Sequence, residues 1–188
     1  MVQAEAIPLD AALEAGRVEL SPELRAAALG DEDAFGCLVR RHQRMVYSIA
    51  WRFFADVAVA EDVAQEVFLQ LFQNLKSVES DSHLLFWLRQ VTSRKCIDHA
   101  RWLEKRRHQS LDAVAEFVPA TETREPDLLE NQRLRRLVAG LPQKLRAVVV
   151  LRFQEELAPA EISKMLGWPV SSVKSRLHRA LKLLRERL

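Results

Sequence analysis

Residues 160–179 read AEISKMLGWPVSSVKSRLHR, and this stretch indicates two helices joined by a tight turn. Ile162, Met165 and Leu166 fall on one side of a short first helix. Gly167 follows them, and a glycine readily adopts the left-handed backbone that ends a helix and opens a sharp turn. These features together predict a helix-turn-helix motif.

The second helix of this motif combines an apolar stripe with a cationic surface, and Ser171 is its predicted N-cap. Small hydroxyls and bases occupy the other side of its first turns: Ser172, Lys174, Ser175, Arg176, His178 and Arg179. A rod of about 15 residues is roughly 22 Å long, which suits the major groove of DNA. Lys and Arg bind phosphates and guanine edges, so the pattern favours DNA binding. An ordinary helical hairpin with a solvated basic face is the alternative interpretation.

The start of the first motif helix departs from good capping. Ala158 precedes Pro159 and has no side-chain oxygen, which predicts a cost of about 1 kcal/mol relative to Ser or Asp. Upstream, helices are predicted over 128–139, where Gly140 follows, and over 142–153, where Pro142 takes a position that tolerates proline.

The first half of the chain is also helical in pattern. Helices are predicted from Pro22, over 31–50, over 60–75 and over 84–107, with a polar loop at 76–82. No useful length of sequence alternates with period two, so no strand is predicted. The sequence predicts an all-α fold with two small helical domains joined by a flexible acidic linker. The predicted parts are an acidic tail over 1–20, a first domain over 21–108, the linker over 109–126 and a second domain over 127–188.

Composition narrows the class of protein. The chain has 188 residues, of which 48% are hydrophobic and 29% charged, which is ordinary for a globular protein with a buried core. No run approaches the ~20 apolar residues of a membrane span, so we expect no membrane insertion. The first basic residue is Arg17, so no signal peptide is indicated. A cytoplasmic location is predicted.

The net charge of +2 hides a strong segregation of charge. Residues 86–107 carry seven bases against two acids, and residues 170–188 carry six bases against one acid. Between them, residues 109–130 carry six acids against one base. Two basic segments separated by an acidic one indicate two places that meet a polyanion, although each segment alone is compatible with a solvated helix face.

Two helix faces in the first domain invite interpretation. Asp62, Gln65, Glu66 and Leu69 share one side of the helix over 60–75. An apolar Leu69 among polar groups indicates a docking patch for a protein, and plain solvation is the alternative. In the helix over 84–107, Phe86 and Trp87 are followed by a series of basic residues. Aromatic side chains beside cations can stack on unpaired nucleobases, which favours binding of single-stranded nucleic acid. A position in the protein core is the alternative interpretation for Trp87.

No catalytic constellation is recognisable. The five histidines are scattered, without an HExxH pair, a GxSxG elbow or a phosphate-binding glycine loop. The two cysteines, Cys37 and Cys96, belong to no CxxC pair and are interpreted as reduced core thiols. We therefore predict a protein that is not an enzyme and has no catalytic residues, metal or cofactor.

Several blocks of the sequence resemble one family. They are DAFGCLVRRHQRMVY at 33–47, AEDVAQEVFL at 60–69, FWLRQVTSRKCIDHAR at 86–101, LPQKLRAVVVLR at 141–152 and the helix-turn-helix. The first three resemble region 2, and the last two region 4, of extracytoplasmic-function sigma factors of the sigma-70 family. Ser163, Lys164 and Trp168 depart from the residues common in this family's motif.

The resemblance implies a bacterial transcription-initiation subunit that binds core RNA polymerase, through its clamp helices and flap, and promoter DNA. It implies that Asp62, Gln65, Glu66 and Leu69 dock on the clamp helices. It assigns the minus-ten element to Val78, Ser80, Asp81, His83, Arg89, Ser93 and Arg94. It assigns the minus-thirty-five element to Lys174, Ser175, Arg176, His178 and Arg179, beside Ser172. The acidic linker would lie in the polymerase's RNA channel.

The resemblance also implies an anti-sigma factor that sequesters these surfaces, and a monomer when the protein is free. The alternative function is a conventional helix-turn-helix regulator, which would bind a palindromic duplex without polymerase. A helical adaptor that binds only proteins would leave the basic helices unexplained.

Overall fold

The computed structural model describes residues 20–109 and 126–187, with side chains for 20–106 and 133–187. All regular elements in these ranges are helical, as predicted. They are α1 (Pro22–Ala28), α2 (Glu32–Phe54), α3 (Val57–Asn74), the 3-10 turn η1 (Leu75–Ser77), α4 (Asp81–Gln109), α5 (Pro126–Ala139), α6 (Gln143–Phe153), α7 (Pro159–Leu166) and α8 (Val170–Arg185). The predicted tail and linker lie almost wholly outside the described residues. None of the described helices is long and apolar enough to cross a membrane.

Side-chain caps set where the first helices begin. The Ser21 hydroxyl accepts a hydrogen bond from the Leu24 N–H at 3.3 Å at the start of α1. The Asp31 carboxylate accepts from the Ala34 N–H at 3.0 Å at the start of α2. Asp56 caps α3 in the same way, which is why α3 begins three residues earlier than the apolar pattern predicted.

The helix-turn-helix is formed by α7 and α8, and Gly167 between them has φ +69°, as its predicted turn requires. Ala158 has no capping oxygen, but the Glu161 carboxylate accepts a hydrogen bond from the Ala158 N–H at 2.6 Å. The prediction of Ser171 as N-cap is wrong. Pro169 holds the N-cap position and α8 starts at Val170, so Ser171 lies inside the first turn. The proline ring presets a backbone angle that suits the entry to a helix.

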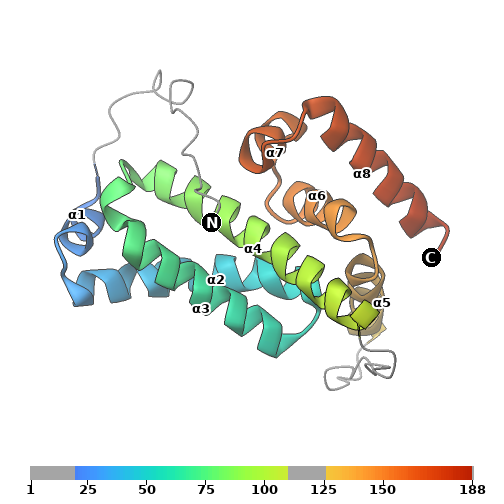
Figure 1. Cartoon of the computed structure of the whole chain (residues 1–188), viewed down its shortest axis with the longest axis horizontal. Coiled ribbons are helices and arrows are strands. Elements are labelled where there is room, and N and C mark those ends of the chain that lie inside the picture. Colours follow the sequence, from blue (N-terminus) through green and yellow to red (C-terminus); the bar gives the residue numbers. More distant parts are fainter. Residues whose placement is uncertain (1–19, 110–125, 188) are drawn as a thin grey trace.

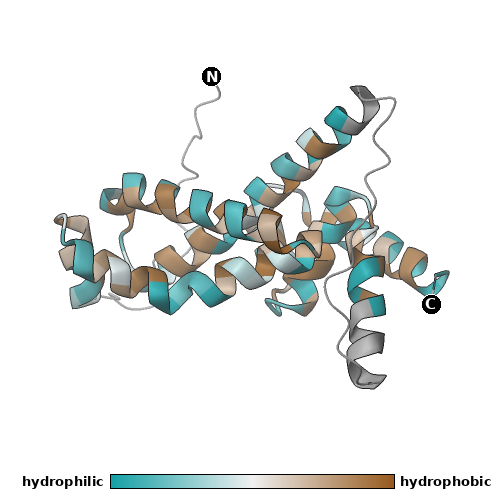
Figure 2. Ribbon diagram, turned by 90° about the horizontal axis from the view of Figure 1, so that it is seen from below, coloured by the Kyte–Doolittle hydropathy of each residue, from teal (hydrophilic) through white to brown (hydrophobic). Residues whose placement is uncertain are grey.

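The first unit is a bundle of α2, α3 and α4, with α1 packed on one end (Figure 1). Its centre contains fully buried large side chains from each long helix, among them Leu38, Phe53, Leu71, Leu84 and Leu88. Hydrophilic and hydrophobic turns alternate along these helices, as expected where one side faces a core (Figure 2).

The second unit packs directly against α4. Ile162, Met165 and Leu166 of α7 belong to the same apolar cluster as Leu88 and Val91 of α4. A smaller cluster fixes α8 on α6 and consists of Leu141, Val149, Ala180 and Leu184. As a result α6 lies between α4 and α8 (Figure 1). The two predicted helical units are present, and they share a core across the seam between them.

Gly167 and Gly36 provide a matched test of backbone strain. A Cβ at Gly167 meets no atom within 4 Å, so Gly167→Ala introduces only the strain of a left-handed alanine. We expect it to lower the free energy of unfolding by about 1 kcal/mol, measured by urea denaturation. Gly36 lies inside α2, where a Cβ meets only the flexible end of Arg40 at 3.2 Å. Gly36→Ala should leave stability unchanged or raise it by up to about 1 kcal/mol. Equal losses in the two variants would contradict this account.

Candidate nucleic-acid interface

The cationic face of α8 is open to solvent. Val173, Ala180 and Leu184 turn inward and are buried, which leaves the opposite side free. Lys174, Ser175, His178 and Arg179 are exposed there, and Ser172 is half-buried at its edge. Four of the six predicted DNA-reading residues therefore form one accessible surface on a 16-residue helix.

Arg176 differs from its neighbours because it lies against the turn of the motif. Its guanidinium carbon is 4.5 Å from the centre of the Trp168 ring, a cation–π contact. The side chain is half-buried, and its Nη1 atom is buried without a hydrogen-bond partner. In this arrangement Arg176 fastens α8 to the turn, whereas Arg179 projects freely.

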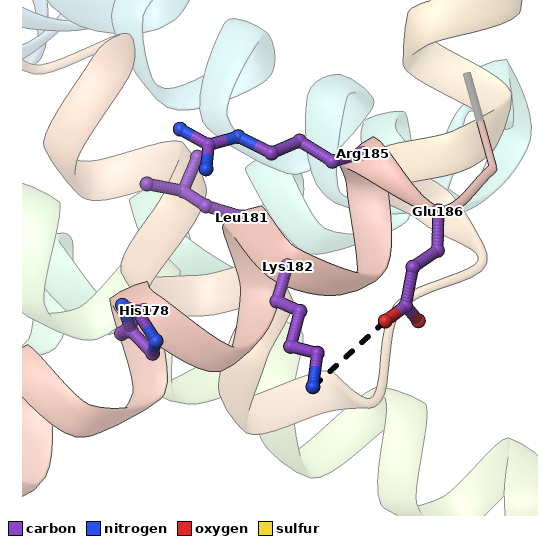
Figure 3. Close-up of a pocket in the computed structure, with 5 residues that line it drawn as sticks. All are labelled: His178, Leu181, Lys182, Arg185 and Glu186. Carbon is purple, nitrogen blue, oxygen red and sulfur yellow. Dashed lines mark ion pairs between the residues drawn. The ribbon is translucent and has the colours of Figure 1, made fainter.

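A shallow hollow of about 360 Å³ lies along the last turns of α8. Figure 3 shows its five lining side chains: His178, Leu181, Lys182 and Arg185 of α8, and Glu186, the C-cap that follows it. Lys182 Nζ and Glu186 Oε1 are 4.0 Å apart in a solvent-exposed ion pair. Such a surface continues the basic face of α8 and has no enclosing second wall among the described residues.

The polar face of α3 is accessible as a unit. Asp62, Gln65, Glu66 and Leu69 are all exposed, and 60% of Leu69 is open to solvent. The Glu66 carboxylate pairs with Lys95 of α4 at 2.7 Å, which ties this face to the bundle. The sequence analysis missed Phe72, which is 54% exposed. Its ring meets the Phe35 ring edge-on, with 5.2 Å between the ring centres. Phe72 lies three residues after Leu69, and this helical spacing could have indicated that both side chains belong to the same exposed face.

The predicted minus-ten residues at the α3–α4 connection mostly hold the connection itself in place. Asp81 and His83 lie in the first turn of α4, which begins three residues before the helix predicted from residue 84. Val78 is buried. The Ser80 hydroxyl accepts from the His83 N–H at 3.0 Å, and His83 Nδ1 accepts from the Glu79 N–H at 3.2 Å. Both Asp81 oxygens accept hydrogen bonds from Ser21, from its N–H and its hydroxyl, each at 2.9 Å. Asp81 thereby anchors the start of α1 to the start of α4.

Two of the predicted minus-ten residues of α4, Arg89 and Arg94, lie at the seam with the second unit. The Arg89 guanidinium donates to Glu155, which follows α6, at 2.7 Å. Ser93 is 2% exposed and donates to the Arg89 carbonyl. Arg94 lines a hollow of about 190 Å³ between the units. The other residues around this hollow are Ile97, Asp98, Arg101, Lys144, Leu166 and Trp168.

Two buried titratable groups have shifted pKa values. Burial lowers the pKa of His42, and the neighbouring Arg41 lowers it further, whereas Asp81 raises it. Burial strongly raises the pKa of the Cys96 thiol, with a smaller opposing effect from Arg146. His42 is therefore held in its neutral form and Cys96 as a thiol, which makes both of them packing residues of the core.

Two family models match the chain, one on each helical unit. The family described as Sigma-70 region 2 matches residues 38–107, which span most of α2 and all of α3. The family described as Sigma-70, region 4 matches residues 131–184, which include α6 and α7 and nearly all of α8. The polar face of α3 and the predicted minus-ten residues lie inside the first matched region, and the cationic residues 172–179 of α8 lie inside the second.

Individual relatives extend the match to nearly the full chain. The ECF RNA polymerase sigma factor SigW of Bacillus subtilis is 30% identical over 183 residues, which cover 90% of this chain and 96% of SigW. The chain belongs to the extracytoplasmic-function sigma factors of the sigma-70 family. The resemblance seen in the sequence is confirmed. As a sigma factor, the protein binds core RNA polymerase and directs promoter-specific initiation of transcription.

Two further comparisons agree with this assignment. This sigma factor is 32% identical over 162 residues to the ECF RNA polymerase sigma-E factor of Escherichia coli, with 80% of this chain and 84% of that protein covered. The solved structure of CnrH in complex with the cytosolic domain of CnrY matches with a TM-score of 0.62 and 25% identity. That match covers 87% of this chain and 93% of CnrH.

The two cysteines should differ sharply in reactivity. Cys96 is fully buried, whereas Cys37 is half-exposed and its sulfur accepts from Arg40 at 3.0 Å. We expect one thiol to react quickly with Ellman's reagent in the native protein and the second only after unfolding, because the thiolate is the reactive species. Cys37→Ser should abolish the fast phase. Rapid reaction of both thiols in the native protein would contradict the burial of Cys96.

Proposed function

We propose that three surfaces of this sigma factor divide the work of promoter recognition. The exposed face of α8 binds the minus-thirty-five element, the α3–α4 loop and α4 bind the minus-ten element, and the polar face of α3 docks on the clamp helices of core RNA polymerase. The observation that supports this division best is the open cationic face of α8, on a helix of a size that enters a major groove. The second helical unit also contacts the flap of the polymerase.

Within α8 the predicted DNA-reading side chains have different roles. Lys174 and Arg179 carry the charge that binds phosphates or guanine edges. Ser175 is small and allows the helix to approach the bases closely. Arg176 acts indirectly, because its stacking on Trp168 holds the reading helix at its angle to α7. The protein contributes no catalytic group of its own to RNA synthesis and acts where the polymerase is, in the cytoplasm.

An anti-sigma factor is the expected regulator. CnrH, whose structure this chain matches, was solved with the cytosolic domain of CnrY bound. By analogy, a protein partner would cover surfaces of this sigma factor that otherwise meet the polymerase.

Replacement of Arg179 tests the role of α8. Promoters are first mapped by run-off transcription with core polymerase and genomic fragments, and the strongest is used for the variants. Arg179→Ala should weaken promoter binding by about 1–3 kcal/mol if the guanidinium contacts a base. Arg185→Ala, on the last turn of the same helix, is the matched control and should have a smaller effect. Equal promoter use by wild type and Arg179→Ala would remove Arg179 from the reading face.

Replacement of Leu69 tests the docking face of α3. Leu69→Arg places a charge in the middle of the predicted contact and should weaken binding to core polymerase roughly ten-fold, as measured by fluorescence anisotropy. Leu29→Arg is a matched control, because Leu29 is also exposed, at 85%, but lies beyond the end of α1. The proposal fails if both variants bind core polymerase with wild-type affinity.

A further inference from the structure

Two residues that depart from the family's common motif meet in the turn between α7 and α8. Ser163 lies in α7, and Trp168 follows Gly167 in the turn. The Ser163 hydroxyl donates to the Trp168 carbonyl at 2.5 Å, and the Trp168 N–H donates to the Ser163 carbonyl at 3.2 Å. One residue therefore binds both backbone polar groups of Trp168, which fixes the start of its side chain relative to α7.

The indole ring of Trp168 links this turn to α8. The ring is half-buried and packs against the main apolar cluster. The Arg176 guanidinium carbon lies over the ring, 4.5 Å from its centre. We call Ser163, Trp168 and Arg176 the turn clasp. Through this clasp, two residues that are unusual for the family act on a cation of the predicted DNA-reading helix.

Arg176 occupies the edge of that helix. It comes one turn after Ser172 and three residues before Arg179, between the buried stripe and the exposed face of α8. An extended arginine at such an edge is placed to bind the phosphates beside the groove. The guanidinium lies on Trp168 instead, and its Nη1 atom is buried without a hydrogen-bond partner among the described residues.

The aromatic ring is the group that retains this guanidinium. A buried donor without an acceptor is unfavourable, so hydrogen bonding of Nη1 does not explain the position of Arg176. No ion pair of Arg176 occurs in the part of the chain that the structure describes. Attraction between the cation and the indole face offsets the cost, because tryptophan is the strongest aromatic partner for a cation.

From these contacts we infer that Trp168 is a specificity-determining residue, because it withholds Arg176 from promoter DNA. Phosphate contacts add affinity but carry no sequence information directly. The clasp removes one cation from the phosphate-binding edge and leaves discrimination to the exposed face of α8. This inference rests on the proposed function of α8. It goes beyond the orientation of that helix, since it concerns which cations reach the DNA.

Salt dependence of DNA binding tests the inference, because it counts the cations that neutralise phosphates. Each phosphate contact contributes about 0.9 to the slope of log affinity against log salt. The sigma factor is assembled with core polymerase, and its binding to a fluorescein-labelled promoter fragment is followed by anisotropy at several KCl concentrations. A second fragment has a scrambled minus-thirty-five element. A shift of α8 that keeps its contacts changes the affinity but not the slope.

Release of the clasp should add one phosphate contact. Trp168→Leu should steepen the slope by about 0.9 and tighten binding to the scrambled fragment about five-fold at about 0.15 M salt. Arg176→Ala should leave the slope unchanged when Trp168 is present, and should cancel both effects when it is combined with Trp168→Leu. Trp168→Phe keeps an aromatic face and is the matched control, with the wild-type slope expected. Thermal melts by circular dichroism confirm that each variant is folded.

Two results would each overturn the inference. One is a shallower slope for Arg176→Ala in the otherwise wild-type protein, which would mean that Arg176 already binds DNA. The other is a wild-type slope for Trp168→Leu, as a purely structural role of the ring predicts. Failure of the proposed function gives a different pattern: Lys174→Ala and Arg179→Ala would then both bind the promoter fragment with wild-type affinity.

Discussion

Helix α4 joins the two helical units of this sigma factor, because it packs against α2 and α3 on one side and against α6 and α7 on the other. One side of α4 contacts the first unit, where Lys95 pairs with Glu66 of α3 and the His99 ring meets the Phe54 ring of α2 edge-on. Another side contacts the second unit, where Gln90 bonds to the Met165 carbonyl and Ile97 lines the hollow beside Leu166. A single helix thus belongs to two layers. Its contacts determine which of its cationic side chains face solvent and which face protein.

Charge alone does not identify a DNA-binding surface in this protein. Both basic segments carry several guanidinium groups, yet in the described structure these groups have different contacts and different exposure. Arg89 is paired with Glu155 across the seam, Arg176 and Arg106 stack on tryptophan rings, and Arg179 projects into solvent. The distinction follows from competition: a guanidinium binds the nearest acceptor or aromatic face, and only one left without such a neighbour is ready for a phosphate.

Local interactions explain which sequence predictions held. Gly167 ends α7 because its left-handed backbone conformation depends on the residue itself and not on contacts with distant parts of the chain. The apolar stripes of α3 and α8 could likewise be predicted, since their residues recur at helical spacing in the sequence. The cap of α8 was misplaced at Ser171 because a proline at the N-cap presets the helix entry without any side-chain hydrogen bond. Phe72 was missed because its exposure depends on how α2 and α3 meet, which spacing along one helix does not reveal.

By itself the sequence determined the all-α fold, the helix-turn-helix, the family and the residues that could carry a binding surface, since these depend on short-range periodicity, turn chemistry and residue order. Only the tertiary structure decided which of those residues are accessible. Val78 and Ser93 are buried, Asp81 is committed to Ser21, and Arg89 is committed to Glu155, 66 positions away in the chain. Long-range pairing of this kind depends on how helices pack in three dimensions, and neither charge nor period along the chain encodes it.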